Sequence, residues 1–382
     1  MENVFGYLEF NPSTEFTLII KKMKIKIFSL LLLSIFIGCN FKSKEQQSID
    51  EKIKKALIQN NVPSLSIGLI KNGKIELVKG FGFVSRTDSS KVNENSIFQI
   101  ASQSKMFTGI IANNLIQEGR LNLNTPITEY LPKEAIKRSK KTLEKIKLRN
   151  LLTHTSGIPS DACSVYRERI EGEAWLKGYP KDRIITDLNQ LKLEFEPNSK
   201  FQYSNSGYAI VGFICEYASG LMYEELLKKY ITDKYHLDNT VVDLSNEQKS
   251  ILVTPYKKSE REIQTKASDM GMATPASAIF SNVTDLTNIL SKQILAYRKK
   301  EIQNPLYLTL NTSKMDEGLE YGFGLIKETK GKTIKYGHGG DADGFACEYF
   351  FNPTENTGIV VLTSSGGRWV GQLANEILES IN

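Results

Sequence analysis

Apolar residues recur along this chain with two periods, and the period changes along its length. Over residues 48–60 they recur every three or four positions, as on one face of a helix, with a capping box at residues 48–51. Over residues 65–77 they alternate with small or polar residues on both sides of the turn signal Asn72-Gly73. The first part of the chain therefore predicts a helix followed by an antiparallel strand pair.

A helical pattern resumes at Ser102 and dominates the middle of the chain. Apolar residues between 106 and 115 fall on one face of a helix that starts near Ser102 and stops at Gly119. Thr125-Pro126 is a start signal for a further helix. Helical segments and loops continue to about residue 315.

Strand patterns return in the last part of the chain. Strands are predicted at residues 321–327, 333–336, 345–351 and 358–363, and an amphipathic helix with Trp369, Leu373, Ile377 and Leu378 follows them. Strands at both ends of the chain indicate one sheet assembled from the two ends. We therefore predict an α/β (α+β) fold, in which an antiparallel sheet flanked by helices carries an inserted all-helical lobe and a cleft between the lobes holds the site. The predicted domain is 48–382, with 48–101 and 320–382 in the sheet lobe and 102–319 in the mainly helical lobe.

Composition is that of a globular protein without a nucleic-acid partner. The 382 residues are 40% hydrophobic and 24% charged, which is sufficient for a large core. The net charge of +6 comes from 49 basic and 43 acidic residues spread along the whole sequence. No compact basic tract with interleaved aromatic residues occurs, so the charge indicates a solvated surface.

The N-terminus carries a separate pattern. Four lysines between residues 21 and 26 precede the apolar residues 27–37, which end in Gly38-Cys39. This apolar stretch is too short to cross a bilayer, which needs about 20 residues, whereas a basic region, a short apolar region and a small residue form an export signal. The string Phe36-Ile37-Gly38-Cys39 resembles a bacterial lipobox, although Phe36 stands where leucine is usual.

We therefore expect residues 1–38 to be an export signal and Cys39 to carry a lipid. Residues 39–47 form a polar tether, and the protein is predicted to be an exported lipoprotein anchored in a membrane on the cell-envelope side. Met23 begins a complete signal by itself and is a candidate for the true start. The alternative is that residues 27–37 form a buried helix of the fold.

The other three cysteines permit at most one disulfide. Cys215 and Cys347 lie in apolar runs, so we predict that they are small buried hydrophobic residues rather than bridge or metal partners. Cys163 has no paired spacing with either of them.

The strongest chemical motif is Ser102-Gln103-Ser104-Lys105, the only Ser-x-x-Lys in the chain. Residues three apart on a helix share a face, so the Lys105 amine can reach the Ser102 hydroxyl. A serine hydroxyl needs a base to become a nucleophile, and lysine serves only if burial or a neighbouring cation lowers its pKa from about 10.4. Taken alone, the motif is better explained as a helix N-cap followed by a surface lysine.

A second motif, Tyr203-Ser204-Asn205, is the only Tyr-x-Asn in the chain and precedes an apolar helix pattern. A tyrosine near a cationic lysine can be partly deprotonated and relay protons, and an asparagine can hold a substrate amide. The alternative for Tyr203 is a buried tyrosine of the core.

The third motif is Gly337-His338-Gly339-Gly340-Asp341, which is predicted to end one strand and turn into the next. Glycines let the backbone approach a ligand closely. The Asp341 N–H is then placed to pair with the Ser102 N–H as an oxyanion hole. The alternative is a plain tight turn.

In this order and at these separations, the three motifs resemble the class C β-lactamase, DD-peptidase and serine-esterase family of penicillin-recognising serine hydrolases. Further matches cover nearly all of the chain from Ser48 onward: Leu151-Leu152-Thr153-His154-Thr155-Ser156-Gly157, Gly80-Phe81-Gly82, Tyr321-Gly322-Phe323-Gly324 and residues 275–285. The resemblance implies a two-lobe β-lactamase-like fold and a site that uses no cofactor or metal.

Carried over residue by residue, the resemblance implies that Ser102 is the nucleophile, Lys105 its activating base and Tyr203 the proton shuttle. Asn205 binds a substrate amide, and the backbone at His338, Gly339, Gly340 and Asp341 lines the substrate. His154 has no catalytic role in the family and is expected to be structural. His236 is expected to be exposed.

The chain departs from the family at two places. His338-Gly339-Gly340 stands where β-lactamases and DD-carboxypeptidases usually carry Lys-Thr-Gly, whose side chains engage a substrate carboxylate. A neutral histidine, a glycine and the negative charge of Asp341 and Asp343 predict poor binding of carboxylates. An ester, a D-amino-acid amide or a small peptide is therefore the favoured substrate. Pro275-Ala276-Ser277-Ala278 also replaces a segment in which two glycines are common.

Three alternatives remain open at this stage. One is a β-lactamase or DD-carboxypeptidase that acts on penicillins or peptidoglycan stems, and the second is a non-catalytic sensor with the same fold. The third is a metal enzyme that uses His338, Asp341 and Asp343, although the sequence lacks a His-x-x-x-His pair.

Overall fold

The computed structural model describes residues 43–168, 178–308 and 312–381, and by its internal contacts the chain divides at Asp50. The predicted lipobox and export signal lie outside the described residues. Helix α2 (Lys44–Gln59) spans the division and begins four residues before the predicted start. No helix of the described part is long and apolar enough to span a membrane.

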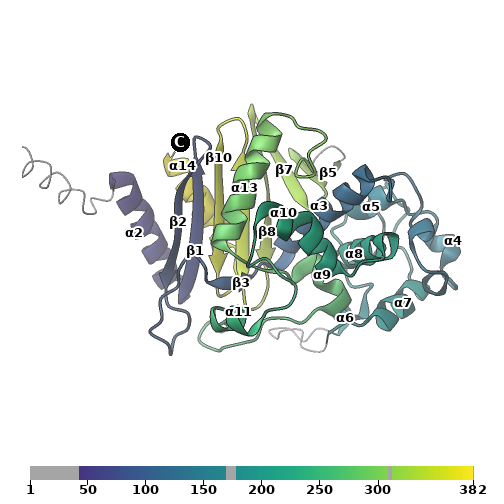
Figure 1. Ribbon diagram of the computed structural model, residues 1–382, viewed down its shortest axis with the longest axis horizontal. Helices are drawn as coiled ribbons and strands as arrows, with labels where there is room; N and C mark the ends of the chain where they lie inside the picture. The colour runs from purple at the N-terminus through teal and green to yellow at the C-terminus, as the bar shows by residue number, and fades with distance from the viewer. Residues whose placement is uncertain (1–42, 169–177, 309–311, 382) are drawn as a thin grey trace, which may run out of the picture. The chain divides into compact units, whose positions relative to one another are not determined.

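The centre of the fold is an antiparallel sheet built from both ends of the chain (Figure 1), as the sequence predicts. Its strand order is β2-β1-β10-β9-β8-β7-β6-β5. The strands are β1 (Ser64–Lys71), β2 (Lys74–Gly82), β5 (Ser313–Asp316), β6 (Leu319–Gly322), β7 (Leu325–Lys330), β8 (Thr333–Asp341), β9 (Ala346–Asn352) and β10 (Thr357–Thr363). Strand β10 is buried at every position and pairs with β1 in a long register, from Leu65 opposite Thr363 to Ile70 opposite Gly358.

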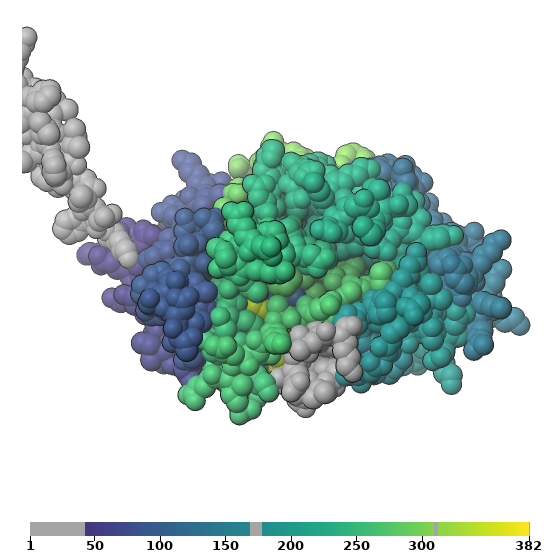
Figure 2. All heavy atoms as spheres, turned by 60° about the horizontal axis from the view of Figure 1, so that its bottom comes forward, coloured from purple at the N-terminus to yellow at the C-terminus, as the bar shows by residue number. Residues whose placement is uncertain are grey.

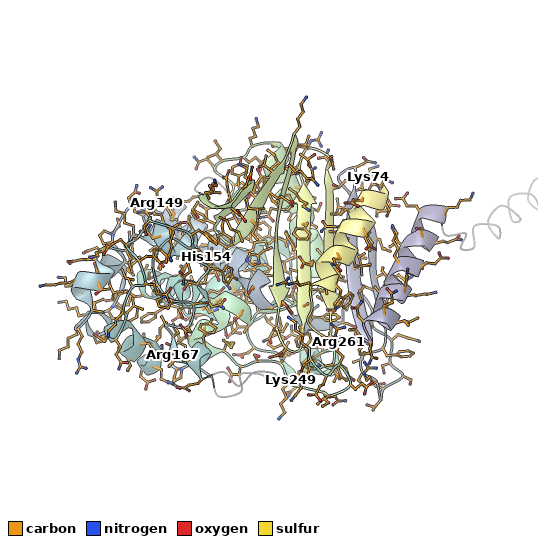
Figure 3. All side chains as sticks on the ribbon, turned by 180° about the vertical axis from the view of Figure 1, so that it is seen from behind. Lys74, Arg149, His154, Arg167, Lys249 and Arg261 are labelled. Carbon is orange, nitrogen blue, oxygen red and sulfur yellow. The ribbon has the colours of Figure 1, made fainter. Side chains whose placement is uncertain are left out.

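Two helices cover opposite faces of this sheet. Helix α13 (Val283–Arg298) packs over β1 and β10 (Figure 1), and Gly68 permits a close approach because a Cβ there would lie 1.8 Å from the Thr287 hydroxyl. Helix α14 (Trp369–Ile381) lies against β9 and β10 on the other face, which Figure 3 shows from behind. Although α13 belongs by sequence to the predicted helical region, it covers the sheet.

The helical region is organised around α3 (Ser104–Gln117), whose residues from Ser104 to Leu115 are all buried. Helix α8 (Asn205–Ser219) packs on α3 and is buried over its first three turns. The remaining elements are β3 (Ile97–Gln99), β4 (Phe280–Asn282), η1 (Ala101–Gln103), η2 (Ile127–Tyr130), η3 (Lys133–Ala135), α4 (Lys140–Leu143), α5 (Leu148–Leu152), α6 (Ser164–Arg167), α7 (Lys181–Asn189), α9 (Tyr223–Leu227), η4 (Lys228–Thr232), α10 (Asp233–Tyr235), α11 (Asn246–Ser250), η5 (Gly271–Ala273) and α12 (Thr274–Ser277). In Figure 2 one face is hollowed between green and teal segments, and yellow atoms from the C-terminal part of the chain are visible in the hollow.

Two predicted elements differ from the structure. The single strand predicted at 321–327 is two strands, β6 and β7, because Phe323 and Gly324 both have positive φ and form a two-residue turn. The helix predicted at Thr125-Pro126 is only the 3-10 turn η2, since Leu131 precedes a proline and is extended.

The prediction for Cys215 and Cys347 is confirmed, because both are buried and free, and Cys163 is buried and free as well.

Candidate active site

Ser102 lies in the 3-10 turn η1, immediately before α3 and close to the helix start that the sequence predicts. The turn is strained, because Ala101 has a φ of 46°. The Ser104 hydroxyl holds it by donating to Ala101 O at 2.7 Å and accepting the Ile279 N–H at 3.1 Å. Ser102 is partly exposed whereas the residues around it are buried, so its hydroxyl is open to a ligand.

Lys105 lies one turn further along, with its side chain fully buried. Its Nζ is 2.8 Å from Asn205 Oδ1, 2.7 Å from the Ala276 carbonyl oxygen and 3.4 Å from Ser102 Oγ. The first two partners are carbonyl oxygens, which only accept. Two N–H groups of the amine are therefore committed, and its third direction faces the Ser102 hydroxyl.

Burial lowers the pKa of Lys105 well below its usual value, because the low-dielectric interior disfavours the charged amine. When Lys105 is neutral, its two remaining N–H groups match the two carbonyl acceptors. The lone pair then faces the Ser102 O–H. The arrangement has the geometry of a general base next to a nucleophile.

Asn205 is positioned by the start of α8. Ser204 is the N-cap, and its hydroxyl accepts the Gly207 N–H at 2.9 Å. The Asn205 N–H donates to the Ser160 hydroxyl at 3.1 Å. Its Oδ1 is committed to Lys105, so Asn205 holds the lysine, a role that sequence reasoning did not assign. Its Nδ2 has no hydrogen-bond partner among the described residues and is available to a substrate carbonyl.

Tyr203 lies beside this pair, with its ring centroid 4.8 Å from Lys105 Nζ. Burial raises the pKa of Tyr203, and its hydrogen bond with Ser102 opposes that rise only in part. The buried environment thus favours the neutral phenol over the partly deprotonated form. Tyr203 can donate its proton rather than receive one at rest.

Strand β8 brings the His-Gly-Gly segment to η1. The strand continues through Asp341, so this motif is extended rather than a turn as predicted. Beyond Gly337, β8 pairs only with β9 among the described residues, because the antiparallel β7 begins near the opposite residue, Ile326. A Cβ at Gly340 would lie 2.4 Å from the Ile100 carbonyl oxygen and 3.2 Å from Ser102 N. Glycine at 340 thus lets the strand edge approach the nucleophile.

His338 is buried, and its ring centroid lies 6.2 Å from that of Tyr203. Burial and the nearby Lys105 lower the pKa of His338 to about 3, so the ring is neutral at neutral pH. Its Nδ1 contacts the Gly339 carbonyl oxygen and therefore carries the proton. Its Nε2 is buried and has no hydrogen-bond partner in the described part of the chain.

The expected negative charge at Asp341 is compensated. Its carboxylate forms an ion pair with Lys258 and accepts the Gly367 N–H at 3.0 Å. No local pattern predicts this pairing, because Lys258 lies 83 positions away in the chain. Asp341 therefore repels an anionic substrate less than an unpaired carboxylate would.

Sequence reasoning also missed the contribution of α12. The Pro275 carbonyl oxygen accepts from the Thr108 hydroxyl at 2.6 Å, and Thr108 is in turn 2.6 Å from the Tyr223 hydroxyl. These bonds hold α12 against α3, so that the Ala276 carbonyl oxygen reaches Lys105. Every residue has a carbonyl oxygen, so no sequence pattern could have identified this one.

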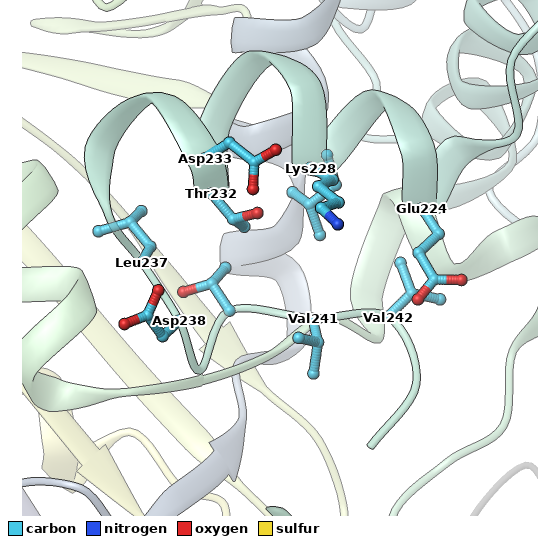
Figure 4. Close-up of a pocket in the computed structure, with 10 residues that line it drawn as sticks. Glu224, Lys228, Thr232, Asp233, Leu237, Asp238, Val241 and Val242 are labelled. Atoms are coloured by element: carbon cyan, nitrogen blue, oxygen red, sulfur yellow. The ribbon is translucent and has the colours of Figure 1, made fainter. Parts of the chain in front are cut away.

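The described residues contain no group of three or more His, Cys, Asp and Glu side chains that could hold a metal ion. The metal-enzyme alternative therefore lacks a ligand set in that part of the chain. A cavity of about 270 Å³ elsewhere is lined by Glu224, Leu227, Lys228, Thr232, Asp233, Leu237, Asp238, Thr240, Val241 and Val242 (Figure 4). None of the predicted site residues lines it.

Comparisons with known proteins show which family this chain resembles over most of its length. A family model described as Beta-lactamase matches residues 49–380. Protein flp of Staphylococcus aureus strain N315 is 27% identical over 339 residues, which are 87% of this chain and 66% of that protein. The chain thus spans slightly less than two-thirds of the length of that relative.

Two further proteins are similar over most of the chain. A protein of Pseudomonas fluorescens named Beta-lactamase is 24% identical over 281 residues, 73% of each chain. The solved structure of an octameric penicillin-binding protein homologue from Pyrococcus abyssi superposes with a TM-score of 0.72 at 25% identity. That match covers 87% of this chain and 76% of the other.

Proposed function

Because the chain belongs to the beta-lactamase family, we propose that it is a serine hydrolase that forms an acyl-enzyme at Ser102. The observation that carries the proposal is the orientation of the buried Lys105 amine. Two carbonyl oxygens hold it, and its third direction faces the Ser102 hydroxyl. The favoured substrates are short esters, D-amino-acid amides and small peptides.

In the proposed reaction, neutral Lys105 takes the proton of Ser102 while the serine oxygen bonds to the substrate carbonyl carbon. The backbone N–H groups of Ser102 and Asp341 are the candidate donors to the resulting oxyanion. Tyr203 donates its phenol proton to the leaving group as the ester or amide bond breaks, and Lys105 returns a proton to Tyr203. Water then attacks the acyl-enzyme and releases the acid and Ser102.

The substrate preference rests on His338 and Gly339. A fixed ammonium opposite a substrate carboxylate is a charge-assisted contact worth about 1.5–3 kcal/mol, and the neutral His338 does not supply it. Its unpartnered Nε2 is instead an acceptor for an N–H or O–H of the substrate. This combination favours uncharged esters and amides over penicillins.

A fluorophosphonate probe followed by a substrate panel tests the proposal. We expect covalent labelling of wild-type protein at Ser102, none of Ser102→Ala, and turnover of p-nitrophenyl esters or D-alanyl amides with little turnover of a cephalosporin. Because Ser102→Ala removes a chemical step, its turnover should fall by several orders of magnitude without unfolding. Near-normal hydrolysis by folded Ser102→Ala would overturn the assignment.

The panel also separates the alternatives. Efficient hydrolysis of nitrocefin without ester turnover would replace the proposal with a β-lactamase. Absence of both labelling and turnover in the folded protein would favour a sensor.

We also propose that the protein is exported and held at a membrane by a lipid on Cys39. The support is the sequence pattern of residues 21–39. The polar segment 39–47 would join the anchor to the hydrolase domain, but the structure shortens the expected tether, because residues 44–47 already belong to helix α2 (Lys44–Gln59).

A further inference from the structure

His154 contacts both neighbours of Tyr203. It follows α5 and adopts a φ of 56°, in the left-handed region. Its carbonyl oxygen accepts the Gln202 N–H at 2.8 Å, and its ring Nδ1 accepts the Ser204 N–H at 3.1 Å. The residues on each side of Tyr203 are thus bound to one residue, and Asn205 follows directly.

The His154 ring also packs against Tyr203 itself. The two ring centroids are 4.4 Å apart, and Tyr321, Tyr208 and Phe201 surround the same imidazole at 4.3, 5.1 and 5.8 Å. In Figure 3, His154 lies among the helical segments beside the sheet. The His154 ring therefore packs against the Tyr203 phenol, and its Nδ1 holds the backbone at Ser204.

Packing alone does not explain a histidine here. To accept at Nδ1, the neutral ring carries its proton on Nε2, and that nitrogen is buried with no hydrogen-bond partner in the described part of the chain. A buried unpaired donor is unfavourable, and phenylalanine would fill the same space without it. What phenylalanine lacks is the acceptor for Ser204.

The groups around His154 keep its ring neutral, so that Nδ1 can accept the Ser204 N–H. The titratable groups facing the ring are Lys105 from α3, His338 from β8, Tyr321 from β6, and Tyr203 and Tyr208 at the start of α8. Burial, Lys105 and His338 all lower the pKa of His154, so the ring stays neutral. A protonated ring would carry a hydrogen on Nδ1 and could not accept from Ser204.

We propose that His154 is a positioning residue that holds Tyr203 and Asn205, and through Asn205 the Lys105 amine, by accepting the Ser204 N–H at Nδ1. This inference rests on the proposed function, since the positioned groups are those of the proposed hydrolysis. It assigns a role to a histidine that the sequence resemblance leaves as merely structural.

Two substitutions at His154 separate positioning from packing. His154→Asn keeps an acceptor near the place of Nδ1 and tolerates positive φ, whereas His154→Phe keeps a ring and removes the acceptor. We expect kcat on a p-nitrophenyl ester to fall about 10²-fold in His154→Phe with KM little changed, and to stay within about fivefold of wild type in His154→Asn. Equal kcat in the two variants would overturn the proposal.

His236 offers a matched control. It has the same φ of 56° but is exposed at the end of α10. His236→Phe and His236→Asn therefore report the cost of the backbone conformation alone, and we expect both to keep wild-type kcat. If His154→Phe does not fold, His154→Gly suits the positive φ, and added imidazole should then raise its kcat. Folded His154→Gly without any imidazole response would count against the proposal.

Amide hydrogen exchange at Ser204 gives a readout that needs no turnover. We expect faster exchange in His154→Phe than in wild type or His154→Asn, because only the first lacks the acceptor. If the wild type hydrolyses nothing while this order of exchange is found, the proposed function fails and the positioning role stands. Identical exchange in all three proteins would overturn the positioning role itself.

Discussion

Burial acts in opposite directions on the ionisable side chains around Ser102. It lowers the pKa of Lys105 and His338, and it raises the pKa of Tyr203. Each shift favours the neutral form. The site therefore combines a neutral base and a neutral proton donor at the Ser102 hydroxyl with a neutral acceptor, His338, whose ring lies beside Tyr203.

The lowered pKa of Lys105 predicts how activity depends on pH. The amine must lose its proton to act as the base, so kcat/KM should rise with pH through the pKa of Lys105 in the folded protein. Because that pKa is lowered, the rise should be complete below the ordinary lysine value of about 10.4. A pH profile of ester hydrolysis measures it.

Lys105→Arg is the sharp variant for this prediction. An arginine side chain is similar in length to lysine, but its guanidinium stays protonated in proteins. It therefore cannot act as the base at any pH. We expect kcat/KM to fall by at least about 10²-fold at every pH, with the rising limb lost. An arginine variant with the wild-type profile would show that another group is the base.

At the scale of elements, the two glycines of β8 have different surroundings. Gly340 faces η1, where a Cβ would meet the backbone at Ile100 and Ser102. Gly339 faces the opposite way, where a Cβ would lie 2.9 Å from the carboxylate oxygens of Glu348, the end of a flexible side chain. The backbone beside Gly340 cannot move aside without displacing η1, whereas the Glu348 side chain beside Gly339 can rotate away.

We therefore expect Gly340→Ala to be more damaging than Gly339→Ala. An extra methyl group in a tightly packed place costs about 1–3 kcal/mol of unfolding free energy, and at 340 it would also displace η1 and reduce fluorophosphonate labelling of Ser102. Gly339→Ala should keep labelling near wild type. Urea unfolding and labelling rates of the two variants measure the difference, and equal effects would contradict the close approach of β8 to Ser102.

The position of Glu348 also affects a variant in which the Lys-Thr-Gly of β-lactamases replaces His338-Gly339-Gly340. His338→Lys with Gly339→Thr would restore the two side chains that the resemblance assigns to a substrate carboxylate, and by that resemblance it should improve acylation by carboxylate substrates. Glu348 occupies the space of a side chain at 339, and burial raises its pKa to about 7. The threonine must displace this carboxyl group, so any gain requires Glu348 to move.

At the scale of the whole molecule, the site joins segments that are distant in sequence. Lys105 binds Asn205 and Ala276, which lie 100 and 171 positions later, and β8 reaches η1 from the far end of the chain. Pairing of β1 with β10 brings the two chain ends into one sheet. The site therefore exists only in the complete tertiary fold.

The proposed anchor is also a property of the whole protein. Cys39→Ser in the full chain should move the protein from the membrane fraction to the soluble fraction and abolish metabolic palmitate labelling, because the thioether bond needs the cysteine sulfur. Cys215→Ser is the control, since Cys215 is buried and free. Full membrane retention of Cys39→Ser would indicate an uncleaved apolar segment instead of a lipid.

The local sequence determined the sheet from two chain ends, the amphipathic helices and the pairing of Ser102 with Lys105. These features depend on hydrophobic period and on residues three apart, which short segments encode. Tertiary structure decided the rest: the Ala276 carbonyl oxygen on Lys105, the Lys258 partner of Asp341, the neutral phenol of Tyr203 and the hold of His154 on Ser204. Backbone acceptors, burial and long-range ion pairs depend on which segments meet, and no local pattern carries that information.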